Sequence, residues 1–286
     1  MVTAGEKSVG KRAILEVLGE RLESHRRVLQ PGEVLSVGRA EPARLVIPRD
    51  QALSEAHFEL TWDGTRCRLR DLGSTTGTLV SGECVAEGEL PHGGWVRAGA
   101  TDFMFYVERA TPPPQPVETE GPERAALVDG VLEQLRTTGQ RLFVVLDTAR
   151  DERIRVLLRE SVEQQRSLYT GPQAEALGDV APYLAVLTPS SSLLEALVRE
   201  GWGKGWGVYL SCPLPFDEVR RHLRKFLLVQ VEDAADPFYF RFYDPRVLRV
   251  FLPTCALEQR NDFFGPVGRF YLEAENGSLL QFLPEK

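Results

Sequence analysis

The chain has 286 residues, of which 43% are hydrophobic and 26% charged, and its formal net charge is −7. This length predicts about two domains, and the acidic balance argues against nucleic acid as a partner. No apolar run reaches the ~18 residues of a membrane span, and the polar first residues do not resemble a signal peptide. We therefore expect a cytoplasmic protein without a membrane partner. The four cysteines, Cys67, Cys84, Cys212 and Cys255, are too far apart in sequence to indicate a metal site or a disulfide framework.

Residues 1–110 are predicted to form strands. Short β-type segments are separated by turn signals such as Asp63-Gly64 and Ser81-Gly82, and helical periodicity is nearly absent. The expected strands lie at residues 14–17, 26–29, 34–37, 45–47, 57–62, 66–70, 78–80, 94–96 and 102–107. Short strands with regular turns predict an all-β sandwich.

Three motifs lie in the loops between these strands. Gly38-Arg39 follows one strand, residues 54–58 (SEAHF) precede another, and residues 71–78 (DLGSTTGT) connect two more. In this order the motifs resemble the forkhead-associated (FHA) domain, a β-sandwich that reads phosphothreonine through its loops. The resemblance covers nearly all of residues 10–108.

The resemblance implies a role for each matching residue. Arg39 would form charge-assisted, bidentate hydrogen bonds with the phosphate, and the Ser54 hydroxyl would donate a hydrogen bond to it. Thr75 and Thr76 occupy the loop that meets the phosphate and the peptide backbone. His57 would be structural, hydrogen-bonded beneath the loops.

Two positions depart from the family pattern. Thr76 stands where the family usually has Asn. An Asn amide can both donate to and accept from a peptide backbone, whereas the Thr side chain is shorter. Glu55 stands where the family often has a basic residue or Asn, and a carboxylate repels a dianionic phosphate unless it turns away. The alternative stays open that Arg39 and His57 only organise the loops, and that this domain binds a partner without phosphate.

Residues 111–123 are rich in proline and then acidic, which predicts an extended linker.

Residues 124–286 alternate between helical and strand patterns, which predicts an α/β domain with a mixed sheet and flanking helices. The expected helices lie at 126–138, around 154–158, around 174–177, after 190 and along 216–227. The expected strands lie at 142–146, 183–187, 207–210 and 238–243, followed by a hairpin of residues 269–273 and 279–282 through Asn276-Gly277.

One stretch of this second domain predicts a strand that leads directly into a helix. Aromatic residues alternate along 238–243, and Asp244-Pro245 is a typical helix start. Arg241, Asp244 and Arg246 gather at this corner, where an Arg fork suits a carboxylate. We interpret them as a structural ion pair; the alternative is an anion-binding or partner-binding site.

Residues 201–207 (GWGKGWG) match no phosphate-binding motif, and the two tryptophans predict a turn anchored in the core or at an interface. Together with residues 142–147 (LFVVLD), 241–248 (RFYDPRVL) and 263–266 (FFGP), they resemble the adaptor, or chaperone, domain of bacterial type VI secretion. The resemblance covers roughly residues 138–284. It implies that this domain holds a toxic effector and loads it onto the spike protein, and it carries no catalytic residues.

We therefore expect an adaptor that is not an enzyme. The sequence contains no GxSxG, no HExxH and no metal-ligand cluster, so no catalytic residue, metal or cofactor is predicted. Asp147 and Asp151 could form a carboxylate pair, but we interpret the first as a strand end and the second as a helix cap. The expected partners are an effector, the spike protein and a phosphothreonine-containing protein. The alternative function is a phosphorylation-controlled signalling scaffold outside secretion.

Overall fold

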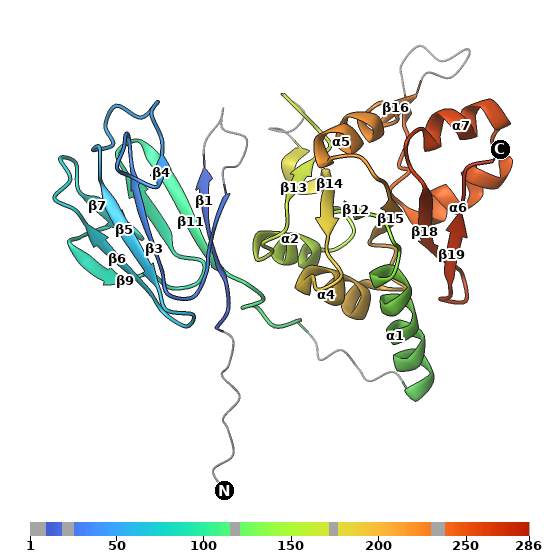
Figure 1. Cartoon of the computed structure of the whole chain (residues 1–286), viewed down its shortest axis with the longest axis horizontal. Helices are drawn as coiled ribbons and strands as arrows, with labels where there is room; N and C mark the ends of the chain where they lie inside the picture. Colours follow the sequence, from blue (N-terminus) through green and yellow to red (C-terminus); the bar gives the residue numbers. More distant parts are fainter. Residues whose placement is uncertain (1–9, 19–25, 115–120, 172–176, 230–237, 286) are drawn as a thin grey trace, which may run out of the picture. The chain divides into compact units, whose positions relative to one another are not determined.

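The computed structural model describes residues 10–18, 26–114, 121–171, 177–229 and 238–285. The chain divides into two compact units, one of residues 1–110 with 159–162 and one of residues 111–158 with 163–286. Figure 1 shows strands throughout the first unit, and helices around a sheet in the second. Among the described helices, none is both long and apolar enough to span a bilayer.

The N-terminal unit is a sandwich of two β-sheets, as the sequence predicts (Figure 1). The six-stranded sheet has the order β2-β1-β11-β10-β7-β8, and the five-stranded sheet has the order β4-β3-β5-β6-β9. The strands are β1 (Ala13–Leu18), β2 (Arg26–Leu29), β3 (Glu33–Gly38), β4 (Leu45–Val46), β5 (Phe58–Trp62), β6 (Cys67–Asp71), β7 (Thr78–Val80), β8 (Glu83–Val85), β9 (Glu87–Glu89), β10 (Trp95–Ala98) and β11 (Thr101–Val107).

Alternating side chains of both sheets fill the space between them. Leu15 of β1 and Phe103 of β11 are fully buried, and Phe103 meets Phe58 of the opposite sheet edge-to-face at 5.4 Å between ring centroids. Burying each of these large side chains stabilises the fold by about 1.5–3 kcal/mol. In β5, β6 and β11, buried positions alternate with half-buried or exposed ones, which is the period of two of a strand with one face on the core.

The C-terminal unit is a three-layer α/β structure, and the predicted fold class is confirmed. Its six-stranded sheet has the order β13-β14-β12-β15-β18-β19. The strands of the unit are β12 (Leu142–Asp147), β13 (Gln165–Ser167), β14 (Pro182–Leu187), β15 (Gly207–Ser211), β16 (Leu228–Val229), β17 (Phe238–Tyr239), β18 (Arg269–Glu273) and β19 (Leu279–Phe282). The helices are α1 (Pro122–Arg136), α2 (Glu152–Arg159), the 3-10 helix η1 (Gly178–Val180), α4 (Ser192–Gly201), α5 (Phe216–Arg224), α6 (Pro245–Thr254) and α7 (Leu257–Phe264).

Both faces of this sheet are covered by helices, which explains why β12 is apolar along its length. Phe143 and Val145 pack into a cluster with side chains of α5, α6 and α7. Val144 and Leu146 pack into a second cluster, with side chains of α1, α2 and α4. A strand buried on both faces has a continuous hydrophobic run in place of an alternating one.

The strand directions differ in one respect from the expected mixed sheet. Each pairing between the described strands of this sheet is antiparallel. β14 and β15, which α4 connects, run in the same direction, as a strand-helix-strand pattern predicts, but β12 lies between them and runs the opposite way. The sequence pattern gives the direction of β14 and β15 and contains no signal that β12 separates them.

The expected strand at 238–243 is wrong beyond its first two residues. Within the described part of the chain, β17 pairs with β16 alone, in a separate two-stranded sheet. The N–H of Asp244 donates to the Arg241 carbonyl at 3.0 Å, which closes a turn. The Phe240 ring lies 4.7 Å from the Phe251 ring, within an aromatic cluster of the core. Phe240 and Phe242 therefore pack against α6 and α7 and do not belong to a central strand, and Phe238 is exposed. The helix start is as predicted, with Asp244 at the N-cap and Pro245 in the first turn of α6.

The remaining boundaries differ little from expectation. α1 begins at Pro122, inside the stretch assigned to the linker, and linker residues 115–120 lie outside the described residues. The helix expected around 174–177 also lies outside them, apart from Leu177. The predicted final hairpin is confirmed as β18 and β19, with Gly277 at a φ of 81° in the turn.

Candidate functional site

Three loops of the N-terminal unit meet at one end of the five-stranded sheet. β3 ends at Gly38, β5 begins at Phe58 and β6 ends at Asp71. The register pairs Phe58 with both Val37 and Asp71, so the three strand ends lie side by side. The loops at these ends carry all four residues predicted to bind a phosphopeptide: Arg39, Ser54, Thr75 and Thr76.

Gly38 lets two of these loops approach each other closely. A Cβ atom at this position would lie 1.9 Å from the carbonyl oxygen of Glu55, which excludes any other residue unless the backbone moves. The close approach is held by hydrogen bonds on either side, from Arg39 N–H to the Ser54 carbonyl and from His57 N–H to the Val37 carbonyl, both at 2.9 Å. Glycine before Arg39 is therefore a packing requirement.

The side chain of Arg39 lies against Gln51. Its Nη1 donates to Gln51 Oε1 at 3.1 Å, and Gln51 Nε2 donates to the Pro48 carbonyl at 3.2 Å. Among the described residues, Gln51 provides the one acceptor for the Arg39 side chain, so most of the guanidinium donors remain open to a ligand. The sequence motifs did not indicate Gln51.

Ser54 and the loop threonines connect the second and third loops. The N–H of Thr75 donates to Ser54 Oγ at 3.0 Å, and the Ser54 hydroxyl lies 3.4 Å from Thr75 Oγ1. The Thr76 hydroxyl donates to the Ala52 carbonyl at 3.3 Å. Both threonines are exposed and Ser54 is half-buried, so all three hydroxyls lie at or near the surface of this loop cluster.

His57 lies beneath the same two loops and is fully buried. Its Nδ1 accepts from the N–H of Ser54 at 3.1 Å, which places the ring proton on Nε2, 3.0 Å from the Gly77 carbonyl. One neutral imidazole thus fixes the Ser54 loop and the Thr75 loop relative to each other.

Two aspartates to which the resemblance assigned no role hold the loops in shape: Asp50, which lies outside the motifs, and Asp71, which begins the third. Asp50 accepts from the N–H groups of Leu53 and Ala100 and from the Thr101 hydroxyl. Asp71 accepts from the N–H of Ser74 and from the hydroxyls of Ser74 and Thr78. Burial by itself raises the pKa of each carboxyl, but the hydrogen bonds outweigh it and hold both pKa values below the ordinary range.

In the C-terminal unit, the three residues predicted to gather at one corner, Arg241, Asp244 and Arg246, take part in two separate ion pairs. Arg246 makes a bidentate contact with Asp244, at 3.0 and 2.6 Å, and Asp244 also accepts from the Arg246 N–H. Arg241 pairs instead with Asp147 at the end of β12, whose side chain is 1% exposed. Burial raises the pKa of Asp244 by itself, but the hydrogen bonds from Arg246 outweigh it and lower the pKa.

The glycine-rich turn between α4 and β15 is anchored in the core. Trp202 and Trp206 are 1% and 4% exposed, and the Trp202 indole N–H donates to the Gly277 carbonyl at 2.7 Å. Gly201 is required because a Cβ there would lie 2.2 Å from the Trp206 ring. The tryptophans therefore lie in the core, which resolves the two alternatives left by the sequence.

Comparison with known families assigns both units. Residues 35–99 match the family model of the FHA domain, and residues 142–262 match that of a domain of unknown function, DUF4123. The chain joins an FHA domain to a DUF4123 domain. The FHA match agrees with the resemblance seen in residues 10–108. The DUF4123 match lies within the second stretch, and it covers the corner, the glycine-rich turn and most of the sheet.

The FHA domain has similar proteins of known structure. FhaA of Mycobacterium tuberculosis, an FHA domain-containing protein, is 37% identical over 71 residues, which are 25% of this chain and 13% of FhaA. The FhaA FHA domain in complex with the intracellular domain of Rv3910 is 30% identical, with 32% of this chain and 98% of that chain covered and a TM-score of 0.30. An FHA domain from a study of phosphothreonine-dependent FHA interactions is 28% identical, with 36% and 98% covered and a TM-score of 0.31.

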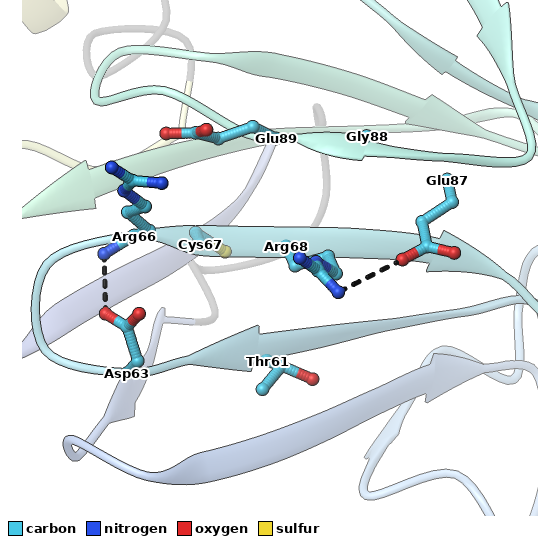
Figure 2. A pocket seen from close by; sticks show the side chains of 8 residues that line it. All are labelled: Thr61, Asp63, Arg66, Cys67, Arg68, Glu87, Gly88 and Glu89. Atoms are coloured by element: carbon cyan, nitrogen blue, oxygen red, sulfur yellow. Dashed lines mark hydrogen bonds and ion pairs between the residues drawn. The ribbon is translucent and has the colours of Figure 1, made fainter.

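A hollow of about 660 Å³ lies elsewhere on the FHA domain, along β6 and β9 (Figure 2). It includes Asp63 and Arg66 of the β5–β6 turn, at the opposite end of these strands from Phe58 and Asp71. Two contacts between its charged residues are local: Asp63 accepts from the Arg66 N–H at 2.7 Å, and Arg68 pairs with Glu87 at 3.5 Å. Within the described residues, no group of His, Cys, Asp or Glu side chains could hold a metal ion.

Proposed function

We propose that the FHA domain binds a phosphothreonine-containing segment of a partner protein through Arg39, Ser54, Thr75 and Thr76. The observation that supports this most strongly is the convergence of these four residues on three loops at one end of one sheet. A guanidinium with open donors and three surface hydroxyls is the donor set that a dianionic phosphate needs. Each hydrogen bond to the phosphate would contribute about 1.5–3 kcal/mol.

The two departures from the family pattern are compatible with this site. Glu55 is exposed, so its carboxylate is free to turn toward water and away from a phosphate beside Arg39. Thr76 presents a hydroxyl where the family has an amide, which leaves one hydrogen bond fewer for the peptide backbone. We therefore expect a phosphate-dependent interaction of lower affinity than an Asn at this position would give.

Calorimetry with a threonine peptide in phosphorylated and plain forms tests this proposal. Arg39→Ala should abolish the preference for the phosphorylated peptide without changing the melting temperature. Arg68→Ala is the matched control, because Arg68 is a surface arginine of the same domain, 75% exposed and paired with Glu87 on the sheet surface. Equal affinity of the unmodified chain for both peptides would show that the FHA domain does not recognise the phosphate.

We also propose that the chain is a cytoplasmic adaptor of type VI secretion and works by binding and not by catalysis. In this function the DUF4123 domain holds an effector and helps load it onto the spike protein. Support comes from the DUF4123 match together with the motif order, LFVVLD, GWGKGWG, RFYDPRVL and FFGP, on which the resemblance to secretion adaptors depends. The FHA domain would add a second, phosphorylation-controlled contact.

Affinity purification of the tagged full chain from its native organism tests the adaptor function. Mass spectrometry of the eluate should find a toxic effector or a spike protein. The control is a chain that carries Arg39→Ala, which should still recover the effector and lose only phosphorylated partners. An eluate with kinases and signalling proteins but no secretion component would support the signalling scaffold instead.

A further inference from the structure

A cavity of about 490 Å³ in the DUF4123 unit is surrounded by positive charge. It lies among the start of α1, the glycine-rich turn, the start of α6 and the β18–β19 turn. Five cationic side chains line it, against the two carboxylates of Glu273 and Glu275; they are Arg124, Arg150, Lys204, Arg246 and Arg249. This volume falls within the ~300–1,000 Å³ of typical ligand sites.

Two of these cations make no direct ion pair in the described structure. Arg246 is paired with Asp244, and Arg249 with Glu275 at 3.1 Å. Arg150 and Lys204 are both exposed, and neither makes an ion pair or a side-chain hydrogen bond with a described residue. These two side chains therefore line the cavity without a direct counter-ion, although Lys204 Nζ lies over the Trp206 ring, 5.5 Å from its centroid, and the charge of Arg150 acts on the Asp244 carboxylate from a greater distance.

Two of the arginines lie against the glycine-rich turn. Gly203 and Gly205 have φ values of +89° and +68°, which favour glycine. A Cβ at Gly205 would lie 3.5 Å from Nη2 of Arg150, and one at Gly203 would lie 3.4 Å from Nη1 of Arg124. Both guanidiniums thus pack against the bare backbone of the turn.

The backbone donors of the same turn are already in use. Glu273 is 8% exposed, and its Oε2 accepts from the Gly205 N–H at 3.0 Å. Burial raises the pKa of this carboxyl, against the effect of the glycine N–H groups and of Arg124. An incoming anion would therefore contact the cationic side chains at the mouth and not the backbone N–H groups that phosphate-binding loops provide.

We propose that this cavity binds an acidic segment, rich in Asp and Glu, of the protein that the DUF4123 domain holds, an inference that rests on the proposed adaptor function. Arginine forks match planar carboxylates, and the cations come from four separate parts of the unit, which suits several carboxylates along one peptide. A single dianionic phosphate would lie against the buried Glu273 carboxylate and find no free backbone donors.

Fluorescence anisotropy with the purified full chain tests this proposal. The probe is a labelled peptide of alternating Glu and Gly, and the matched control peptide replaces every Glu with Gln. The acidic peptide should bind more tightly, and its affinity should fall with added salt. Arg150→Glu and Lys204→Glu should each weaken it about tenfold or more, since each loses a charged contact.

Arg221→Glu is the matched control variant, because Arg221 is an exposed arginine of α5 that does not line the cavity. It should leave the affinity nearly unchanged, and all three variants should keep the melting temperature of the unmodified chain. Equal binding of the Glu and Gln peptides, or equal losses in all three variants, would overturn the proposal. Full displacement of the peptide by inorganic phosphate would also overturn it, in favour of a phosphate site.

A pull-down separates this proposal from the adaptor function on which it rests. The tagged full chain and its Arg150→Glu form are compared for recovery of the natural partner, and the variant should recover less. Equal recovery would contradict the cavity as the partner site and leave the adaptor function intact. If the unmodified chain recovers no partner protein at all, the adaptor function is contradicted. The proposal that the acidic segment belongs to a protein held by the DUF4123 domain is then contradicted too.

Discussion

Ser54 and Thr75, which are 21 residues apart in sequence, share a hydrogen bond in which the Thr75 N–H donates to Ser54 Oγ at 3.0 Å. The hydroxyl that the FHA resemblance assigns to the phosphate therefore also orders the neighbouring loop. A phosphate could accept the Ser54 proton while its oxygen keeps the Thr75 contact, because a hydroxyl both donates and accepts.

Ser54→Ala should therefore weaken phosphopeptide binding about 10-fold to 150-fold, which corresponds to about 1.5–3 kcal/mol for the lost hydrogen bond to the phosphate. Ser54→Thr keeps the hydroxyl and should retain most of the affinity. Calorimetry with the phosphorylated peptide measures both variants. If Ser54→Ala binds as well as the unmodified chain, Ser54 only shapes the loop.

Gly38→Ala should disrupt the loop cluster, because its new Cβ would collide with the backbone oxygen of Glu55. We expect a lower melting temperature of the FHA domain together with lost phosphopeptide binding. Gly88→Ala in β9 is the control, since a Cβ there meets no atom within 4 Å. Similar stabilities of the two variants would show that the close approach at Gly38 is not required.

Asp50→Asn should destabilise the FHA domain at neutral pH and flatten its acid dependence. The folded pKa of Asp50 is lowered, so its carboxylate stabilises the fold above the unfolded pKa of about 3.9, and this stabilisation is lost as the pH falls through the folded pKa. An Asn amide would also point a donor at the N–H of Ala100.

Thermal melts between about pH 3 and pH 7 measure this difference, which should shrink on the acid side of about pH 4. Glu83→Gln, on the exposed surface of β8, is the control and should melt like the unmodified chain at each pH. A constant difference between Asp50→Asn and the unmodified chain across this range would show that the carboxylate charge is not what matters.

Arg241→Ala should destabilise the DUF4123 domain by about 1–3 kcal/mol, because it leaves the buried Asp147 carboxylate without its charged partner. Asp147→Ala in the same chain should recover part of that loss, since no unpaired carboxylate remains. Chemical denaturation of the two single variants and the double variant gives the coupling energy. Strictly additive losses would mean that the two side chains do not stabilise each other.

Asp244→Ala should lower the melting temperature of the same domain, because it removes the N-cap of α6, a loss of about 1 kcal/mol. Asp244→Asn keeps a capping oxygen but loses the charge that pairs with Arg246. Its melting temperature should therefore lie between those of Asp244→Ala and the unmodified chain. An unchanged melting temperature combined with lost partner binding would favour the alternative interpretation of this corner as a binding site.

The sequence predicted those parts of the molecule that depend on local patterns. The alternating strands of the sandwich, the doubly buried run of β12 and the Asp244-Pro245 helix start each have a periodicity or a dipeptide as their cause. The loop motifs were short enough to be recognised by residue type and order. The turn of the final hairpin at Gly277 was indicated in the same way.

Contacts between distant segments were not predictable, because no local pattern encodes them. Arg241 was expected near Asp244, yet its partner Asp147 is 94 residues away in sequence. Asp50 reaches the Thr101 hydroxyl across 51 residues. The expected strand at 238–243 failed for a different reason: Phe240 and Phe242 pack against α6 and α7, which follow directly in the chain, and an alternation of aromatic residues does not distinguish such contacts from those of a strand.

The buried position of His57 has a kinetic consequence. The imidazole is hydrogen-bonded to both the Ser54 loop and the Thr75 loop in the folded protein. The conformational entropy of these loops is therefore lost on folding, before a partner binds. A peptide then encounters groups that need no rearrangement. Its association should be a single fast step whose rate depends on diffusion and ionic strength, with no slower phase from loop closure.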